Sequence, residues 1–108
     1  MTGDAGCIFC RIVRGEVPAN RLHEDEDILA FHDVRPQAPV HFLIIPKAHV
    51  PTLYEAGMDQ HRALGRMLAL AGDLARKAGA TDGFRTIINT GRGGHQEGYH
   101  VQIGRAHV

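Results

Sequence analysis

Two cysteines, Cys7 and Cys10, lie near the N-terminus in a C-x-x-C arrangement, and the chain also contains eight histidines. Zinc prefers four sulfur or nitrogen ligands in a tetrahedron, and a C-x-x-C turn supplies two of them. His49 and His100 are candidates for the other two. Spacing alone leaves an alternative open, in which the cysteines are small buried apolar side chains. A redox pair is disfavoured because no βαβ pattern flanks the cysteines.

Two further patterns could bind a nucleotide. The loop that begins at Asn89 and ends at Gly94 is rich in glycine, which would let backbone N–H groups approach a phosphate, and Asn89 adds an amide donor. The loop lacks the G-x-x-x-x-G-K spacing, which argues against P-loop chemistry. In the second pattern, Phe31 could pack on a base while Asp33 accepts hydrogen bonds from a ribose. Each pattern taken alone also fits an ordinary turn.

Hydrophobic patterning predicts the elements that must position these residues. Short strands are expected at 20–24, 28–33, 41–46, 84–89 and 99–103, and the acidic run at 24–27 is expected to form a hairpin turn. A short helix is expected at 8–14. Asp59 is expected to cap a long helix that runs to about Ala78 and stops at Gly79. Strands around one long helix, without a βαβ rhythm, predict an α+β fold with a mainly antiparallel sheet.

Composition narrows the class of protein. The 108 residues predict a single domain, 1–108. Twelve basic and twelve acidic residues leave no net charge, so no basic field is available to gather nucleic acid. No apolar segment has the length of a membrane span, and the N-terminus lacks the basic and apolar regions of a signal peptide. We therefore expect a cytoplasmic protein without nucleic-acid or membrane partners.

In combination, these patterns resemble the histidine triad (HIT) family, in the branch of the nucleoside phosphoramidate hydrolases. The resemblance covers roughly residues 7–102, and Asn89 and the segment 94–100 continue it. Three runs carry most of it: CIFCRIVRGEVPA at 7–19, LAFHD at 29–33 and PQAPVHFLIIPKAH at 36–49. It implies an α+β fold in which five-stranded antiparallel sheets pair in a homodimer, and a purine nucleotide such as AMP or an adenylyl conjugate as ligand.

The resemblance also assigns roles to individual residues. It places Phe31, Asp33 and Val34 around the purine and ribose, and Asn89, His95, Gln96 and Glu97 at the phosphate. It gives His41 the task of holding the neighbourhood of the nucleophile in register. It implies structural zinc bound by Cys7, Cys10, His49 and His100.

The family signature alternates three histidines with apolar residues, and its middle imidazole attacks the α-phosphorus. The outer histidines position the phosphate and assist the leaving group, so the resemblance also implies a catalytic role for His100. This chain keeps His100 but has Gln102 at the nucleophile's position and Gly104 at the third. A carboxamide nitrogen shares its lone pair with the carbonyl and is not a useful nucleophile near neutral pH. We therefore expect the native form to hydrolyse nucleoside phosphoramidates or adenylyl conjugates and the chain as written to be inactive. The alternative is a non-catalytic, zinc-stabilised nucleotide-binding module.

The C-terminal tail offers an explanation for the defect. Residues 103–108, IGRAHV, are the translation of ATC-GGA-AGA-GCA-CAC-GTC, part of a common sequencing adapter. The adapter begins with AG, and a native C before it gives CAG, the codon for Gln102. That C is also the first base of a histidine codon. The sequence thus predicts that 103–108 is a non-native tail, that the native residue 102 is histidine, and that the last strand and C-terminal segment are incomplete. A genuine, divergent C-terminus is the alternative.

Overall fold

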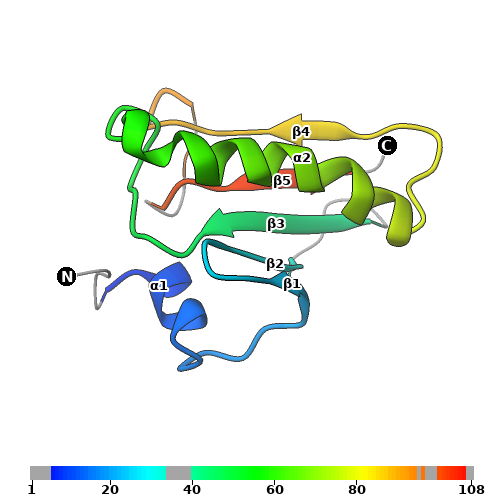
Figure 1. Cartoon of the computed structure of the whole chain (residues 1–108), viewed down its shortest axis with the longest axis horizontal. Helices are drawn as coiled ribbons and strands as arrows, with labels where there is room; N and C mark the ends of the chain where they lie inside the picture. The colour runs from blue at the N-terminus through cyan, green and yellow to red at the C-terminus, as the bar shows by residue number, and fades with distance from the viewer. Residues whose placement is uncertain (1–5, 34–39, 95, 97–99, 107–108) are drawn as a thin grey trace.

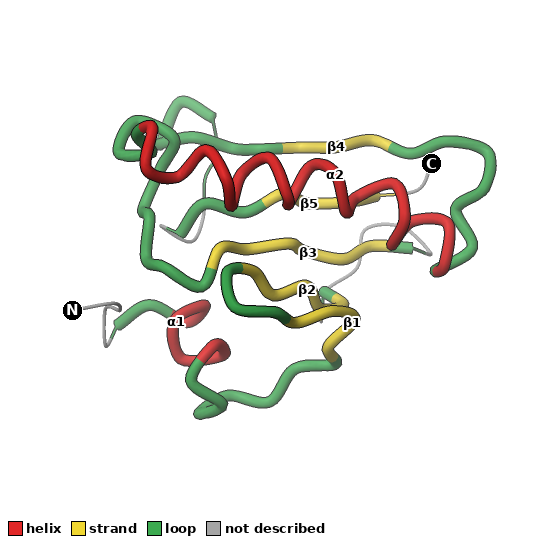
Figure 2. Tube along the Cα trace, viewed as in Figure 1, coloured by secondary structure: helices red, strands yellow, loops and turns green. Residues whose placement is uncertain are grey.

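The computed structural model describes residues 6–33, 40–94, 96 and 100–106. Its elements, in chain order, are α1 (Ile8–Val13), β1 (Arg21–Glu24), β2 (Ile28–His32), β3 (His41–Pro46), the 3-10 turn η1 (Met58–Gln60), α2 (His61–Lys77), β4 (Arg85–Ile87) and β5 (Ile103–Ala106). All pairings are antiparallel and the strand order is β1-β2-β3-β5-β4 (Figures 1 and 2). The predicted α+β fold with a five-stranded antiparallel sheet and one long helix is confirmed. No helix in the described ranges is long and apolar enough to cross a membrane.

The sheet has a buried core on each face, because side chains of a strand alternate between faces. Ile28, Ala30, Phe42 and Ile44 belong to the core under α2, together with Met67 and Leu74 of that helix. Leu29, Phe31, Leu43 and Ile45 belong to the other core, which Ile12 of α1 completes. Both faces of β2 and β3 are therefore covered, one by each helix.

The long helix α2 follows the predicted periodicity, with Met67, Ala71, Leu74 and Ala75 buried. It ends where predicted: Gly79, just past the helix, has φ +99°, a conformation that glycine adopts without strain. The predicted cap was wrong. Asp59 lies inside η1, where its carboxylate accepts a hydrogen bond from Gln60, and α2 begins after Gln60 without a side-chain cap.

The last strand also differs from the prediction of 99–103. β5 begins at Ile103, which pairs with Ile44, and continues to Ala106. Residues 100 and 101 instead bond to the end of β3 and the segment after it: Nε2 of His100 donates to the carbonyl of Pro46, and the backbone N–H of Val101 donates to the carbonyl of Val50 at 2.6 Å. Because of these hydrogen bonds, residues 100 and 101 are not part of the β3–β5 pairing, which begins at Ile103. Tyr99, where the strand was expected to start, lies outside the described residues.

The acidic run forms the predicted turn between β1 and β2, and Asp25 connects this turn to α2. Its carboxylate accepts hydrogen bonds from the backbone N–H groups of Asp27 and Ile28 and from the Arg66 guanidinium. Burial opposes ionisation, but the bonds from His23 and the two amides, with the Arg66 charge, hold the pKa of Asp25 well below its ordinary value. The turn is thereby tied to the helix by charge as well as by packing.

Candidate functional site

The four predicted metal ligands come together although they are far apart in sequence. Cys7 precedes α1 and Cys10 lies within it, while His49 and His100 come from the segments after β3 and before β5. Their ligand atoms all lie within 4.8 Å of one another. Cys10 and His100 are buried, at 2% and 0% exposure. The cluster is therefore a shielded set of two sulfurs and two nitrogens.

The distances in the cluster match those of a tetrahedral metal site. Bonds of 2.3 Å to sulfur and about 2.0–2.1 Å to nitrogen place a sulfur and a nitrogen ligand about 3.5 Å apart in a tetrahedron. Nδ1 of His100 is 3.5 Å from Sγ of Cys7 and 3.6 Å from Sγ of Cys10. Nδ1 of His49 is 3.1 Å from Sγ of Cys10. The residues present thus fit zinc in both chemistry and spacing.

His100 is held on both sides of its ring. Its Nε2 lies 2.7 Å from the backbone carbonyl of Pro46, which requires the proton on Nε2 and leaves Nδ1 as the free lone pair toward the two sulfurs. Burial lowers the pKa of His100 and the neighbouring His49 lowers it further, although the Pro46 carbonyl acts in the opposite sense. A neutral imidazole with a free Nδ1 is the form that ligates metals.

A cavity of about 560 Å³ lies on the α1 side of the sheet and collects five of the ten predicted nucleotide and catalytic residues. Phe31 and Asp33 line it from β2 and the residue after it, and His41 lines it from β3. Asn89 and Gln102 complete this set. The cavity therefore combines an aromatic wall with a carboxylate, an imidazole and two amides.

Gln102 and His41 occupy the polar part of the cavity. Nε2 of His41 lies 3.4 Å from Oδ2 of Asp33. Oε1 of Gln102 is buried and has no hydrogen-bond partner. A buried carbonyl oxygen without a donor is unfavourable.

The phosphate-facing residues implied by the resemblance are only partly described. Gln96 is buried and packs the glycine-rich loop, accepting from the N–H of Gly91 at 2.8 Å and donating to the carbonyl of Pro51 at 2.6 Å. It is not among the residues that line the cavity. Val34, His95 and Glu97 lie outside the described residues.

The sequence analysis missed the contribution of α1 to the cavity. Ile8, Phe9 and Ile12 line it, and the ring of Phe9 lies 6.2 Å from that of Phe31 and 5.8 Å from that of His100, measured between centroids. The position of Phe9 between the two cysteines was the available signal: a residue between two ligands of one ion must lie close to it.

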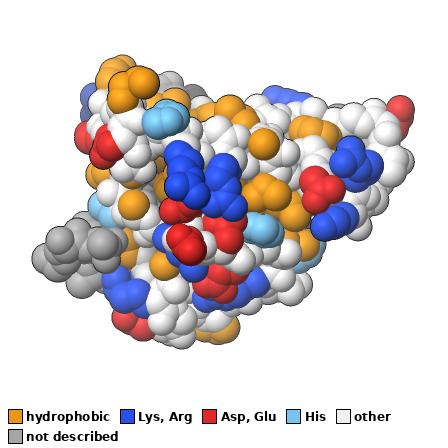
Figure 3. All heavy atoms as spheres, viewed as in Figure 1, with side chains coloured by type: hydrophobic (Ala, Val, Ile, Leu, Met, Phe, Trp, Pro, Cys, Tyr) orange, Lys and Arg blue, Asp and Glu red, His pale blue; other side chains and the backbone are white. Residues whose placement is uncertain are grey.

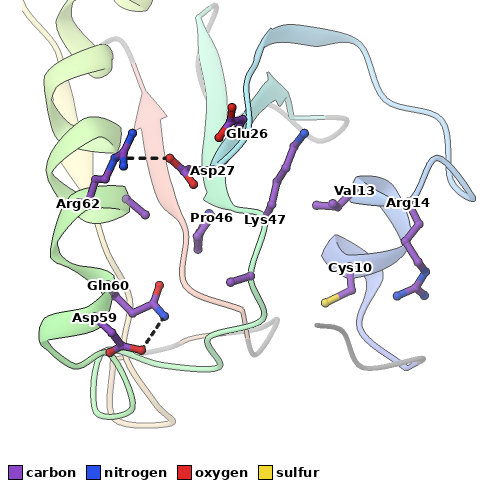
Figure 4. Close-up of a pocket in the computed structure, with 12 residues that line it drawn as sticks. Cys10, Val13, Arg14, Glu26, Asp27, Pro46, Lys47, Asp59, Gln60 and Arg62 are labelled. Atoms are coloured by element: carbon purple, nitrogen blue, oxygen red, sulfur yellow. Dashed lines mark hydrogen bonds and ion pairs between the residues drawn. The ribbon is translucent and has the colours of Figure 1, made fainter. Parts of the chain in front are cut away.

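A second cavity, of about 460 Å³, lies between α1, the β1–β2 turn and the start of α2 (Figure 4). Cys10 lines it, so it approaches the metal cluster from the other side. Its charged groups pair locally: Arg62 with Asp27 at 3.8 Å, and Lys47 with Glu24 at 2.8 Å. Across the face in Figure 3, Lys and Arg side chains likewise lie among Asp and Glu.

Comparison with known proteins agrees with this fold and identifies a family. The model of the HIT domain matches residues 14–103. Protein HitA of Neisseria gonorrhoeae is 44% identical over 97 residues, which are 90% of this chain and 91% of that protein. The purine nucleoside phosphoramidase of Escherichia coli K12 is 43% identical over 97 residues, covering 89% of this chain and 82% of that protein.

Solved structures give the same result. A HIT family hydrolase from Legionella pneumophila superposes with a TM-score of 0.89 at 43% identity, covering 94% of this chain and 91% of that one. A HIT family hydrolase from Clostridium thermocellum superposes with a TM-score of 0.93 at 32% identity, covering 98% and 93%.

Proposed function

The chain belongs to the HIT domain family, and from this premise we propose that its α1-side cavity binds a purine nucleotide, either AMP or an adenylyl conjugate. The observation that carries the proposal is the convergence of Phe31, Asp33, His41, Asn89 and position 102 on one cavity. The Escherichia coli relative, named as a purine nucleoside phosphoramidase, supports the choice of ligand.

In the proposed complex, the purine packs on the Phe31 wall and the ribose hydroxyls donate to Asp33. Asn89 and the glycine-rich loop 90–94 donate to the phosphate, because amide N–H groups favour an anion. Residues 34, 95 and 97 are proposed to extend the same contacts: Val34 beside the purine, His95 and Glu97 beside the phosphate. Gln96 acts on the phosphate indirectly, by holding the loop through Gly91.

The proposed reaction of the native form is hydrolysis in two displacements. An imidazole at position 102 forms a bond to the α-phosphorus, the P–N bond breaks, and the amine leaves with a proton from the site. Water then attacks phosphorus and releases the nucleotide and the free imidazole. His41 holds residue 102 in register. Gln102 cannot form the first bond, so the chain as written binds the nucleotide without turning it over.

We attribute Gln102 to the non-native tail at 103–108, and the orphaned Oε1 of Gln102 supports this, since the position lacks a donor for an amide carbonyl. Sequencing the locus from intact genomic DNA tests the attribution. A histidine codon at 102 followed by a different C-terminus is expected. A CAG codon followed by the same tail would overturn it.

Calorimetry with AMP, paired with an adenosine phosphoramidate assay, tests the function. We expect this chain to bind AMP but to show turnover several orders of magnitude below that of the Escherichia coli relative assayed beside it. Gln102→His should form a nucleotidyl adduct on residue 102, detectable by mass spectrometry, whereas Gln102→Asn should not. Family-like turnover by the unmodified chain would contradict the role given to position 102, and absent AMP binding would contradict the cavity.

We also propose that Cys7, Cys10, His49 and His100 hold a structural zinc ion, supported by their spacing and burial. The ion would cross-link α1 to the sheet and contribute no chemistry to the phosphate. Metal analysis should find stoichiometric zinc that is lost in His49→Ala. Fully folded, zinc-free protein would contradict the site. Ligation through thiolates needs a reducing compartment, which supports a cytoplasmic location.

A homodimer is the proposed assembly. β4 is an edge strand with all three side chains exposed, including Ile87, and Phe84 just before it is 41% exposed. Exposed apolar side chains along an edge strand favour contact with a second copy of the chain. Light scattering should give twice the mass of one chain, and Ile87→Lys should reduce it to one; a monomer at high concentration would overturn the proposal.

A further inference from the structure

We propose that metal binding at the cysteine–histidine cluster and nucleotide binding in the α1-side cavity strengthen each other, with Phe9 connecting the two sites. This inference rests on the proposed function, because it needs a nucleotide in that cavity. It goes beyond that function in making the metal a regulator of nucleotide affinity.

One short helix serves both sites. Cys7 and Cys10 belong to the metal cluster, and Phe9 lies between them in sequence and lines the nucleotide cavity. The Phe9 ring packs 5.8 Å from the ring of His100, a third ligand, and 6.2 Å from the ring of Phe31 on the opposite side. Phe9 is thus in contact with the ligand set and with the proposed purine wall at once.

The helix depends on its anchors for its position. α1 has six residues, too few to be stable as an isolated helix. Apolar packing of Phe9, Ile12 and Val13 against the core holds it, and Arg21 donates a hydrogen bond to the carbonyl of Ile12 at 2.7 Å. A metal ion would add bonds to both cysteines and tie them to His49 and His100. Metal binding would therefore fix the helix against the sheet.

The position of α1 affects the nucleotide because this helix forms one wall of the cavity. Ile8, Phe9 and Ile12 of α1 face the strands that carry Phe31 and Asp33. Without the metal, a nucleotide must order this wall when it binds, which lowers its affinity. With the metal, the wall is already in place. Because linkage is reciprocal, the nucleotide must raise metal affinity by the same factor.

The test measures zinc affinity of the folded, zinc-loaded protein by competition with a chromophoric chelator, with and without saturating AMP. We expect AMP to tighten zinc by a factor between about 5 and 150, the usual range of such couplings. Adenosine has the purine but no phosphate that could bind zinc itself, and it should also raise the zinc affinity. Ribose 5-phosphate should leave the zinc affinity unchanged. Calorimetry of AMP with the zinc-loaded and stripped proteins should give the same factor.

Phe9→Ala should remove most of the coupling while the protein still binds zinc, and Phe9→Leu should retain part of it. His49→Ala should lower AMP affinity as stripping does, although His49 does not line the cavity. Equal zinc affinity with and without AMP, or full coupling in Phe9→Ala, would overturn the inference and leave the proposed function standing. Failure of AMP to bind the zinc-loaded protein would instead be a failure of the proposed function.

Discussion

The unpaired carbonyl of Gln102 predicts that the same substitution will have opposite effects at two glutamines, Gln102 and Gln96. Oε1 of Gln102 is buried without a donor. Gln96 is 7% exposed, and both ends of its amide are paired, with the N–H of Gly91 and the carbonyl of Pro51. Methionine has nearly the shape of glutamine and no strongly polar atom, so Gln→Met isolates the hydrogen-bonding contribution at each site.

The magnitudes follow from the cost of unmade hydrogen bonds. A buried unsatisfied polar group costs about 1–3 kcal/mol, and Gln102 is only half-buried, so Gln102→Met should stabilise the fold by about 1 kcal/mol. Gln96→Met leaves two backbone groups without partners and should destabilise it by about 2–4 kcal/mol. In a domain of this size, 1 kcal/mol corresponds to about 4 °C in Tm.

Urea denaturation of the two variants and the parent protein measures both effects. The midpoints should move in opposite directions at constant m, since neither change alters the surface exposed on unfolding. A destabilised Gln102→Met, or an unchanged Gln96→Met, would refute the assignment of one amide as orphaned and the other as satisfied.

Three further predictions concern the turn, the loop and the metal cluster. Asp25→Asn should lower stability by about 1–2 kcal/mol by removing the charge that Arg66 faces. Because folding lowers the pKa of Asp25, its carboxylate stabilises the fold above the ordinary carboxyl pKa of about 3.9, and this contribution is lost as the pH falls below that value. The stabilities of parent and variant should therefore converge in acid denaturation curves. Gly94→Ala would place a Cβ 2.5 Å from the carbonyl oxygen of Thr90, which should cost about 1–3 kcal/mol of stability. Scanning calorimetry should therefore find a lower Tm, and titration calorimetry should find weaker AMP binding. Cys10→Ser should lose zinc on dialysis and unfold at a lower temperature than the parent, whereas the two should match in excess chelator.

The α2 prediction shows how far periodicity reaches. Apolar residues at steps of three and four fixed the buried face of the helix and Gly79 fixed its end, because both are local properties of the chain. The predicted start of the helix was wrong because Met58–Gln60 form a 3-10 turn, which places Asp59 inside that turn and not at the cap of α2. The last strand was misplaced for a nonlocal reason, namely that Val101 bonds to Val50.

The candidate site was also predicted from the sequence only in part. The spacing of Cys7 and Cys10 and the resemblance named all four metal ligands, but only the fold shows that their donor atoms converge within 4.8 Å. The sequence analysis assigned no role to Phe9, because contact between Phe9, Phe31 and His100 depends on how α1 packs on the sheet.

By itself, the sequence determined the α+β class, the family motifs and most of the helices and strands, and it predicted a chemical deficit at position 102, because each of these is set by residue type and local spacing. The tertiary structure alone decided which residues share a cavity, that Oε1 of Gln102 lacks a partner, and that one helix serves both sites. These depend on contacts between segments as far apart as Cys7 and His100, which no local pattern specifies.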